Sequence, residues 1–101
     1  WCKLDNYIYY VNLFDYYGNL LTTKQQQYFE DYYFNNLSLS EMSENLGISR
    51  NAINKQLHKA VEKLEYYEKQ LELYQKKQKI MRYLDKTNIE KSIKEKIEEF
   101  I

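Results

Sequence analysis

The residue types that read nucleic-acid bases are gathered in one short stretch that starts at Ser49. Arginine can bond both acceptors on the edge of a guanine, and asparagine can do the same for adenine. Lysines further along can meet phosphates, which position a protein without specifying a sequence. On a helix that begins here, the outward residues and candidate nucleic-acid contacts are Ser49, Arg50, Asn51, Asn54, Lys55, His58 and Lys59.

The sequence offers no recognisable catalytic or metal-binding pattern. Cys2 and His58 are the only cysteine and histidine, so a disulfide within the chain and a zinc site of several such ligands are excluded. No nucleophile stands with a base, and no phosphate loop or fixed carboxylate pair is present. We therefore expect no enzyme, no catalytic residue and no cofactor. The plain alternative for each exposed Arg, Asn, Lys or His in the stretch is a solvated side chain.

The charge of the chain is zero overall but is unevenly distributed. Residues 1–48 have two bases and six acids, whereas residues 49–82 have nine bases and four acids. Any attraction to phosphate therefore begins at Arg50. The length of 101 residues suits one small domain, residues 1–101. No apolar run can span a membrane and no signal peptide opens the chain, so we expect a cytoplasmic protein.

Apolar spacings of three and four residues, with two glycines and no proline, predict an all-α fold. A first helix is expected over about 5–21, with Gly18 as either a close helix contact or a C-cap. A capping box at Thr22 or at Thr23 opens a second helix that ends near Phe34. The apolar stripe predicted for the first helix is Ile8, Val11, Phe14, Tyr17 and Leu21.

Residues 38–60 predict a helix-turn-helix motif. Ser38 and Glu41 form a capping box for a third helix, which ends at Gly47 because glycine adopts the left-handed conformation there without strain. Ser49 caps the next helix, and Ser43 is the small residue where the two helices cross. The apolar residues that should wedge the motif together are Met42, Leu46, Ile48, Ile53 and Leu57, flanked by Ala52.

The helix that starts at Ser49 meets no breaker until about Asp85, which makes residues 61–101 a long extension with a final helix. Thr87 with Glu90 is expected to open that helix, whose apolar face is Ile89, Ile93, Ile97 and Phe100. A heptad-like seam runs along the long helix and needs cover, either from the same chain or from a second copy. We favour a symmetric homodimer through Leu64, Tyr67, Leu71, Tyr74, Met81 and Leu84.

The segment from Tyr16 to Lys76 resembles the YlxM family of small bacterial proteins. The resemblance rests on "LLTTKQ", the "YY" before the turn, "SLSE", "LGISR" and "AVEKLEYYEKQL". The central segment is also similar to region 4 of sigma factors. The resemblance implies a cytoplasmic DNA-binding protein associated with the signal recognition particle and its receptor. Ser43 departs from the alanine usual in the family.

Two functions remain open. The first is a DNA-binding regulator or accessory factor of the signal recognition particle pathway, with the RNA of that particle as an alternative polyanion. The second is a protein-interaction module that uses a tyrosine-rich face of the first two helices, which the zero net charge favours.

Overall fold

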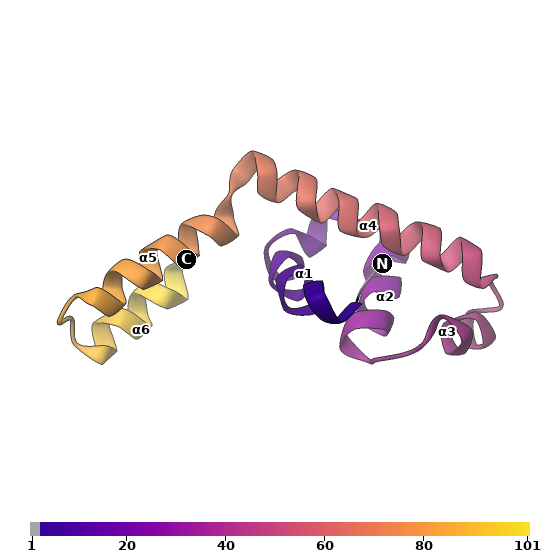
Figure 1. The fold of residues 1–101 in the computed structure, drawn as a ribbon, viewed down its shortest axis with the longest axis horizontal. Helices are drawn as coiled ribbons and strands as arrows, with labels where there is room; N and C mark the ends of the chain where they lie inside the picture. Colours follow the sequence, from indigo (N-terminus) through magenta and orange to yellow (C-terminus); the bar gives the residue numbers. More distant parts are fainter. Residues whose placement is uncertain (1–2) are drawn as a thin grey trace.

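The computed structural model describes residues 3–101, and it describes side chains from Tyr7 onward. Cys2 lies outside the described residues. The described chain is helical, as predicted, and its α-helices are α1 (Lys3–Tyr17), α2 (Thr23–Phe29), α3 (Leu39–Leu46), α4 (Arg50–Leu71), α5 (Leu73–Lys86) and α6 (Lys91–Phe100). The molecule is elongated, 54 × 25 × 23 Å. Helices α1, α2 and α3 lie under α4, while α5 and α6 form a separate hairpin at the other end (Figure 1).

The first two helices pack on the middle of α4. Leu13, Phe29 and Tyr33 are completely buried and share one core with Leu64 of α4. Phe14 stacks on Phe29 with ring centroids 4.5 Å apart. This cluster fixes α1 and α2 against the same face of α4, which leaves the opposite face of α4 to solvent.

The details of this region differ from the sequence prediction in two places. Ile8 was placed in the apolar stripe but is 73% exposed, whereas Leu13, which the stripe left out, is completely buried. Gly18 is buried and begins the 3-10 turn η1 (Gly18–Leu20). A Cβ added there would lie 3.0 Å from the Phe14 ring, so the side chain that limits the space at Gly18 belongs to the preceding helix α1 itself, and no left-handed cap forms.

The second helix begins as predicted and ends irregularly. The Thr22 hydroxyl accepts from the Gln25 backbone N–H and the Gln25 side chain accepts from the Thr22 backbone N–H, each at 3.2 Å. The helix then widens into the π-helical turn η2 (Glu30–Phe34). Asn36, with φ of 56°, breaks the pattern before α3.

The helix-turn-helix prediction is confirmed over α3 and α4. The Ser38–Glu41 capping box is present, and Gly47 ends α3 with φ of 67° and ψ of 27°. The Ser49 hydroxyl caps α4 by accepting from the Ala52 backbone N–H at 3.2 Å. The buried side chains that join the two helices are Tyr28, Met42, Ile53 and Leu57, with Leu46 and Ile48 packed around them.

The single long helix expected from Ser49 to Asp85 is wrong, because the chain breaks at Glu72. Glu72 is left-handed, with φ of 55° and ψ of 31°, and it separates α4 from α5. The side chain of Glu68, only 2% exposed, stabilises this elbow. Its carboxylate accepts from the Tyr17 hydroxyl at 2.7 Å and from the Tyr74 and Gln75 backbone N–H groups at 3.1 Å each. By accepting from these two backbone N–H groups, the Glu68 carboxylate supplies the cap that the N-cap residue of α5 lacks.

The Tyr17 hydroxyl completes the elbow by accepting from the Leu73 backbone N–H at 3.1 Å. Burial, assisted by the hydrogen bond to Glu68, raises the pKa of Tyr17 to about 12 from its ordinary 10.0. The first backbone donors of α5 are thus satisfied by one carboxylate and one phenol of the same chain. The direction of α5 depends on this contact between residues 51 positions apart.

The capping box predicted at Thr87 is also wrong. The Thr87 hydroxyl donates to the Leu84 carbonyl at 2.9 Å and so closes the end of α5. Helix α6 begins after Glu90 without a side-chain cap. Its predicted apolar face is only partly covered, since Ile93 is 49% and Phe100 76% exposed.

Within the described residues, no helix combines the length and the apolar character needed to cross a membrane.

The backbone at Gly47 generates the first prediction. A Cβ added there would meet nothing within 4 Å, but φ is +67°, so a side chain costs conformational strain alone. We expect Gly47→Val to lower the unfolding free energy by about 1–2 kcal/mol. Gly47→Asn is the matched control and should lose less, because asparagine tolerates this conformation. Equal melting temperatures for the parent and the valine variant would contradict the assignment.

The raised pKa of Tyr17 generates the second prediction. The folded protein holds this proton more tightly than the unfolded chain, so the stabilisation is complete below pH 10 and is lost as pH rises through about 12. We expect the unfolding free energy of the parent to fall between these pH values by about 2–3 kcal/mol more than that of Tyr17→Phe. Urea unfolding at a series of alkaline pH values measures the difference. Parallel curves would show that Tyr17 is not held in this way.

Candidate nucleic-acid interface

The structure places the predicted contacts on the first turns of α4, where the buried face of the helix determines which side chains face outward. Ile53 and Leu57 are completely or almost completely buried, which turns the opposite side of α4 away from the core. The exposed members of the predicted set are Ser49, Arg50, Asn51, Lys55, His58 and Lys59. Asn54 is only half-exposed, and Ala52, expected to flank the core, is exposed.

Arg50 is not freely extended. Its Nη1 donates to the Ser40 hydroxyl at 3.2 Å, which joins the start of α4 to the first turn of α3. Both side chains are exposed, so the bond competes with water and contributes little to stability. The bond holds the guanidinium between the first turns of α3 and α4, where a base edge or a phosphate could replace the serine as its acceptor.

Ser43 has a structural use that alanine could not provide. Its hydroxyl donates to the Ile48 carbonyl at 2.6 Å, across the turn. The bond holds the segment between the two helices and satisfies a carbonyl in a partly buried position. The serine predicted at the crossing thus stabilises the turn that sets the direction of α4 relative to α3.

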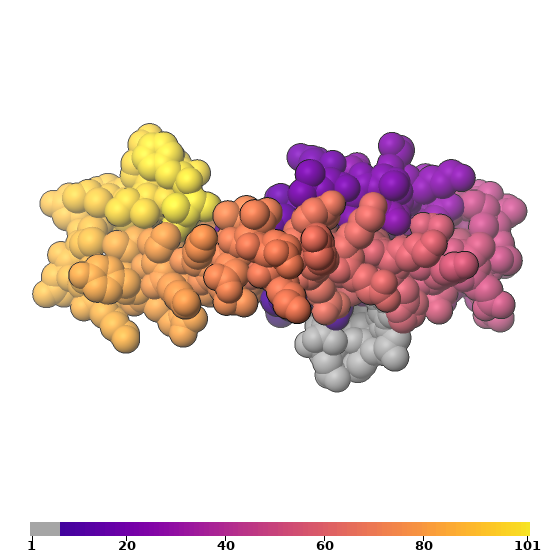
Figure 2. Space-filling view, turned by 90° about the horizontal axis from the view of Figure 1, so that it is seen from above, coloured from indigo at the N-terminus to yellow at the C-terminus, as the bar shows by residue number. Residues whose placement is uncertain are grey.

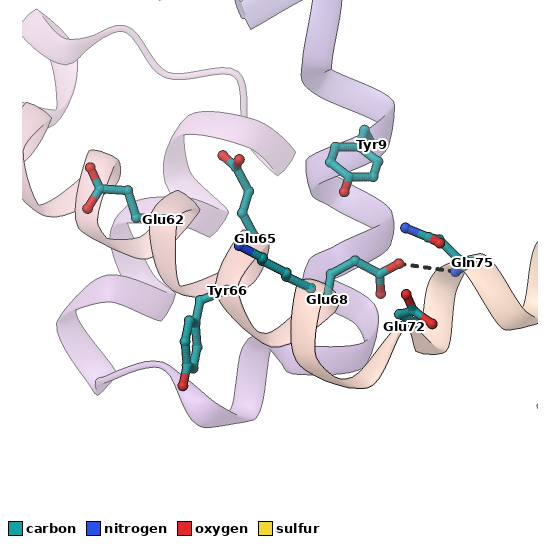
Figure 3. Close-up of a pocket in the computed structure, with 8 residues that line it drawn as sticks. Tyr9, Glu62, Glu65, Tyr66, Glu68, Glu72 and Gln75 are labelled. Carbon is teal, nitrogen blue, oxygen red and sulfur yellow. Dashed lines mark hydrogen bonds between the residues drawn. The ribbon is translucent and has the colours of Figure 1, made fainter.

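The second half of α4 is acidic. Glu62, Glu65 and Glu72 surround an open hollow of about 390 Å³ at the elbow, together with Tyr9, Tyr66, Glu68, Lys69 and Gln75. Figure 3 shows Glu68 bonded to Gln75 in this hollow, with the other carboxylates around it. Carboxylates here raise the pKa of the Tyr9 and Tyr10 phenols further, after burial itself. This surface repels a polyanion.

The basic region predicted from Arg50 onward is therefore split in two. Residues 50–59 have three bases and no acid, residues 60–72 have two bases and four acids, and α5 has five bases and one acid. The elbow places its acids between the two basic segments. The basic surface of α4 is thus limited to residues 50–59, about three helical turns.

The residues predicted to form a dimer seam do not share one helix. Leu64 is completely buried in the core of its own chain, and Leu84 is 7% exposed. Tyr67 and Tyr74 are half-buried against the first core cluster, and Met81 is also half-buried. Leu71 remains 46% exposed, at the last position of α4.

The tyrosine-rich face proposed for a protein partner is largely internal. Tyr28 is 4% exposed and Tyr33 is completely buried, while Tyr32 is half-exposed. Tyr28 contributes to the core that joins α2 to the helix-turn-helix. It cannot contact a partner without unfolding that core.

Glu68 and Tyr17 were not recognised from the sequence as a pair. The available signal was the position of Glu68, which follows Ala60 and Leu64 at intervals of four on the buried face of α4. A carboxylate in such a row requires several hydrogen bonds. The partner 51 residues away is not readable from local spacing.

Comparison with known proteins agrees with this geometry. Residues 4–101 match a family described as "Putative helix-turn-helix protein, YlxM / p13 like". A UPF0122 protein of Caldanaerobacter subterraneus is 44% identical over 82 residues, covering 81% of this chain and 70% of that protein. A UPF0122 protein of Fusobacterium nucleatum is 39% identical over 97 residues, covering 89% of this chain and 94% of that protein.

Proposed function

The chain belongs to the UPF0122 family of YlxM / p13-like helix-turn-helix proteins, and from this premise we propose that it binds duplex DNA through the first turns of α4. The observation that supports the proposal most is the basic, outward face of residues 50–59 on a correctly capped second helix of the motif. In helix-turn-helix proteins this part of the second helix enters the major groove.

The proposal assigns different roles along the helix. Arg50 and Asn54 lie in the opening turns, where side chains reach base edges, and Asn51 lies between them. Lys55 and Lys59 face solvent and contact phosphates. Ser49 offers its backbone at the helix N-terminus, where the helix dipole favours a phosphate. His58 lies on the same exposed face.

The roles of these residues can be separated by single substitutions. Arg50→Ala and Asn54→Ala should each cost about 1–3 kcal/mol of binding and relax sequence preference, whereas Lys59→Ala should weaken binding to all sequences alike and reduce the salt slope by about one unit. Selection of preferred duplexes from a random pool, followed by binding titrations across a salt series, measures both effects. Lys96→Ala on α6 is the control for loss of an exposed lysine.

A parent protein that binds no duplex at low salt would contradict the proposal. So would three α4 variants that bind as the parent does, because the basic face of α4 would then be merely solvated. Melting temperatures should be nearly unchanged in all three, since the positions lie outside the core.

We also propose that the protein is a homodimer, because a twofold axis would present two copies of α4 to paired half-sites. Large apolar side chains remain exposed on both sides of the elbow, among them Tyr66 at 59%, Leu71 at 46% and Leu73 at 42%. A second copy is a natural cover for such residues.

Leu71→Lys tests the assembly. A charge at a site covered by a second copy should shift the protein from dimer to monomer. Sedimentation equilibrium of the parent and of the variant measures the change, with Ile93→Lys as the matched control, because Ile93 is similarly exposed, at 49%, and lies near the start of α6, at the end of the hairpin away from the elbow (Figure 1). A parent protein that sediments as a monomer would contradict the proposed homodimer.

The family resemblance, and nothing else, supports a proposed accessory role in the signal recognition particle pathway. That role would place the protein in the cytoplasm, with components of that particle, or its RNA, as partners. On that RNA, α4 would contribute phosphate contacts only, because the deep, narrow major groove of duplex RNA does not admit a helix.

A further inference from the structure

Helix α5 has a second basic surface, separate from that of α4. Lys76, Lys79, Arg82 and Lys86 are all exposed, and their spacing of three or four residues places them along one side of the helix. The opposite side packs inward, through half-buried Tyr74 and Met81 and buried Leu84. Seen from above, α5 continues the line of α4 along the molecule (Figure 2).

The cations of this surface lack acidic partners. Among the residues that the structure describes, the ion pairs involve α6 and its contact with Asp85: Lys91 with Glu95, Lys94 with Asp85, and Lys96 with Glu99. None of the four α5 cations takes part in them. Asp85, the one acid of α5, is thus occupied by Lys94. Within the described part of the chain, the four cations on the exposed side of α5 therefore form no ion pair with a carboxylate.

An aromatic ring lies among these cations. Tyr83 is 68% exposed, more than the other exposed tyrosines of the described residues, Tyr66 at 59% and Tyr9 at 37%. It stands four residues after Lys79 and three before Lys86, so the two ammonium groups flank it on the helix surface. Ring and cations together match the means by which proteins bind single strands: phosphates pair with the cations, and a base stacks on the ring.

We propose that the exposed side of α5 binds a single strand of nucleic acid, with Tyr83 as the stacking platform and Lys76, Lys79, Arg82 and Lys86 as the phosphate contacts. The strand lies along α5. Cations repeat at about 4.5–6 Å along the helix axis, which suits a polymer with a regularly repeated negative charge.

The geometry favours this partner over a lipid surface. A helix that lies on a membrane buries a continuous apolar face, but the apolar side of α5 is turned inward at Tyr74, Met81 and Leu84. The large apolar side chains left exposed on α5 are Leu73 at 42%, Ile80 at 39% and Tyr83 at 68%, and they share the outside of the helix with its cations. The cations also oppose pairing of this side of α5 with the same side of a second copy, because like charges would face one another, so the proposed dimer contact stays at the elbow.

The surface is independent of the proposed duplex contact on α4. The acidic hollow around Glu62, Glu65 and Glu72 lies between the two basic segments, so one straight polyanion cannot follow both without crossing it. Arg50 and Asn54 should not contribute to single-strand binding, and the α5 cations should not set duplex sequence preference. Each proposal can therefore fail without the other.

The test uses the full chain and labelled oligonucleotides of deoxythymidine and of uridine, with binding followed by fluorescence anisotropy across a salt series. Lys79→Gln with Lys86→Gln should lower the salt slope by about 1.4, the value for two phosphates on a single strand. Tyr83→Leu should weaken binding roughly five- to 150-fold without changing the slope. Lys91→Gln with Lys96→Gln on α6 is the matched control and should bind as the parent does. Comparing the two oligonucleotides shows whether the strand is DNA or RNA.

A parent that binds neither oligonucleotide at low salt would overturn the proposal. So would equal losses of single-strand affinity in the α5 and α6 variants, or an Arg50→Ala variant that loses as much single-strand affinity as the α5 pair. Binding of anionic vesicles that Tyr83→Leu abolishes, with oligonucleotide binding unchanged, would assign the surface to lipid instead. Circular dichroism confirms that each variant is folded before it is scored, and glutamine preserves helix propensity.

Discussion

One face of α4 is the constraint on which the rest of the fold depends. Ile53 and Leu57 hold the helix-turn-helix, while Ala60, Val61 and Leu64 hold α1 and α2. Burial of each larger side chain of this row contributes about 1.5–3 kcal/mol to the free energy of unfolding. Because the row belongs to both core clusters, the single helix α4 connects them. Because this face is fully used for packing, the opposite face is directed to solvent, and the first turns of α4 lie over α3 with their outer side exposed (Figure 1).

The elbow shows how a single charged side chain can redirect the chain. A carboxylate that is 2% exposed must be hydrogen-bonded, and Glu68 meets this requirement by taking the first backbone donors of α5 and the hydroxyl of Tyr17. The result is a bend at Glu72 where the sequence has no glycine or proline. It also gathers acids at the bend, which divides one basic stretch of sequence into two separate surfaces.

Sequence reasoning was most successful where structure is decided locally. The capping boxes at Thr22 and Ser38 and the left-handed Gly47 depend on residues within a few positions of one another, and all are present. It failed at Glu72, because a left-handed glutamate has no local signature and the elbow there depends on the hydrogen bond between Tyr17 and Glu68, which are 51 positions apart. The prediction failed at Thr87 because its hydroxyl could bond to the end of α5 or to the start of α6. In the structure the hydroxyl donates to Leu84 at the end of α5. For the candidate site, helix periodicity predicted the outward side chains, but not that Arg50 bonds to Ser40.

The proposed binding of duplex DNA to the exposed first turns of α4 can be observed residue by residue in backbone amide spectra of the ¹⁵N-labelled protein, recorded during titration with a preferred duplex. We expect the shifts to concentrate on residues 49–59 and the first turn of α3, with the acidic elbow and the interior of α2 unaffected. Shifts confined to α1 and α2, or none at low salt, would contradict it.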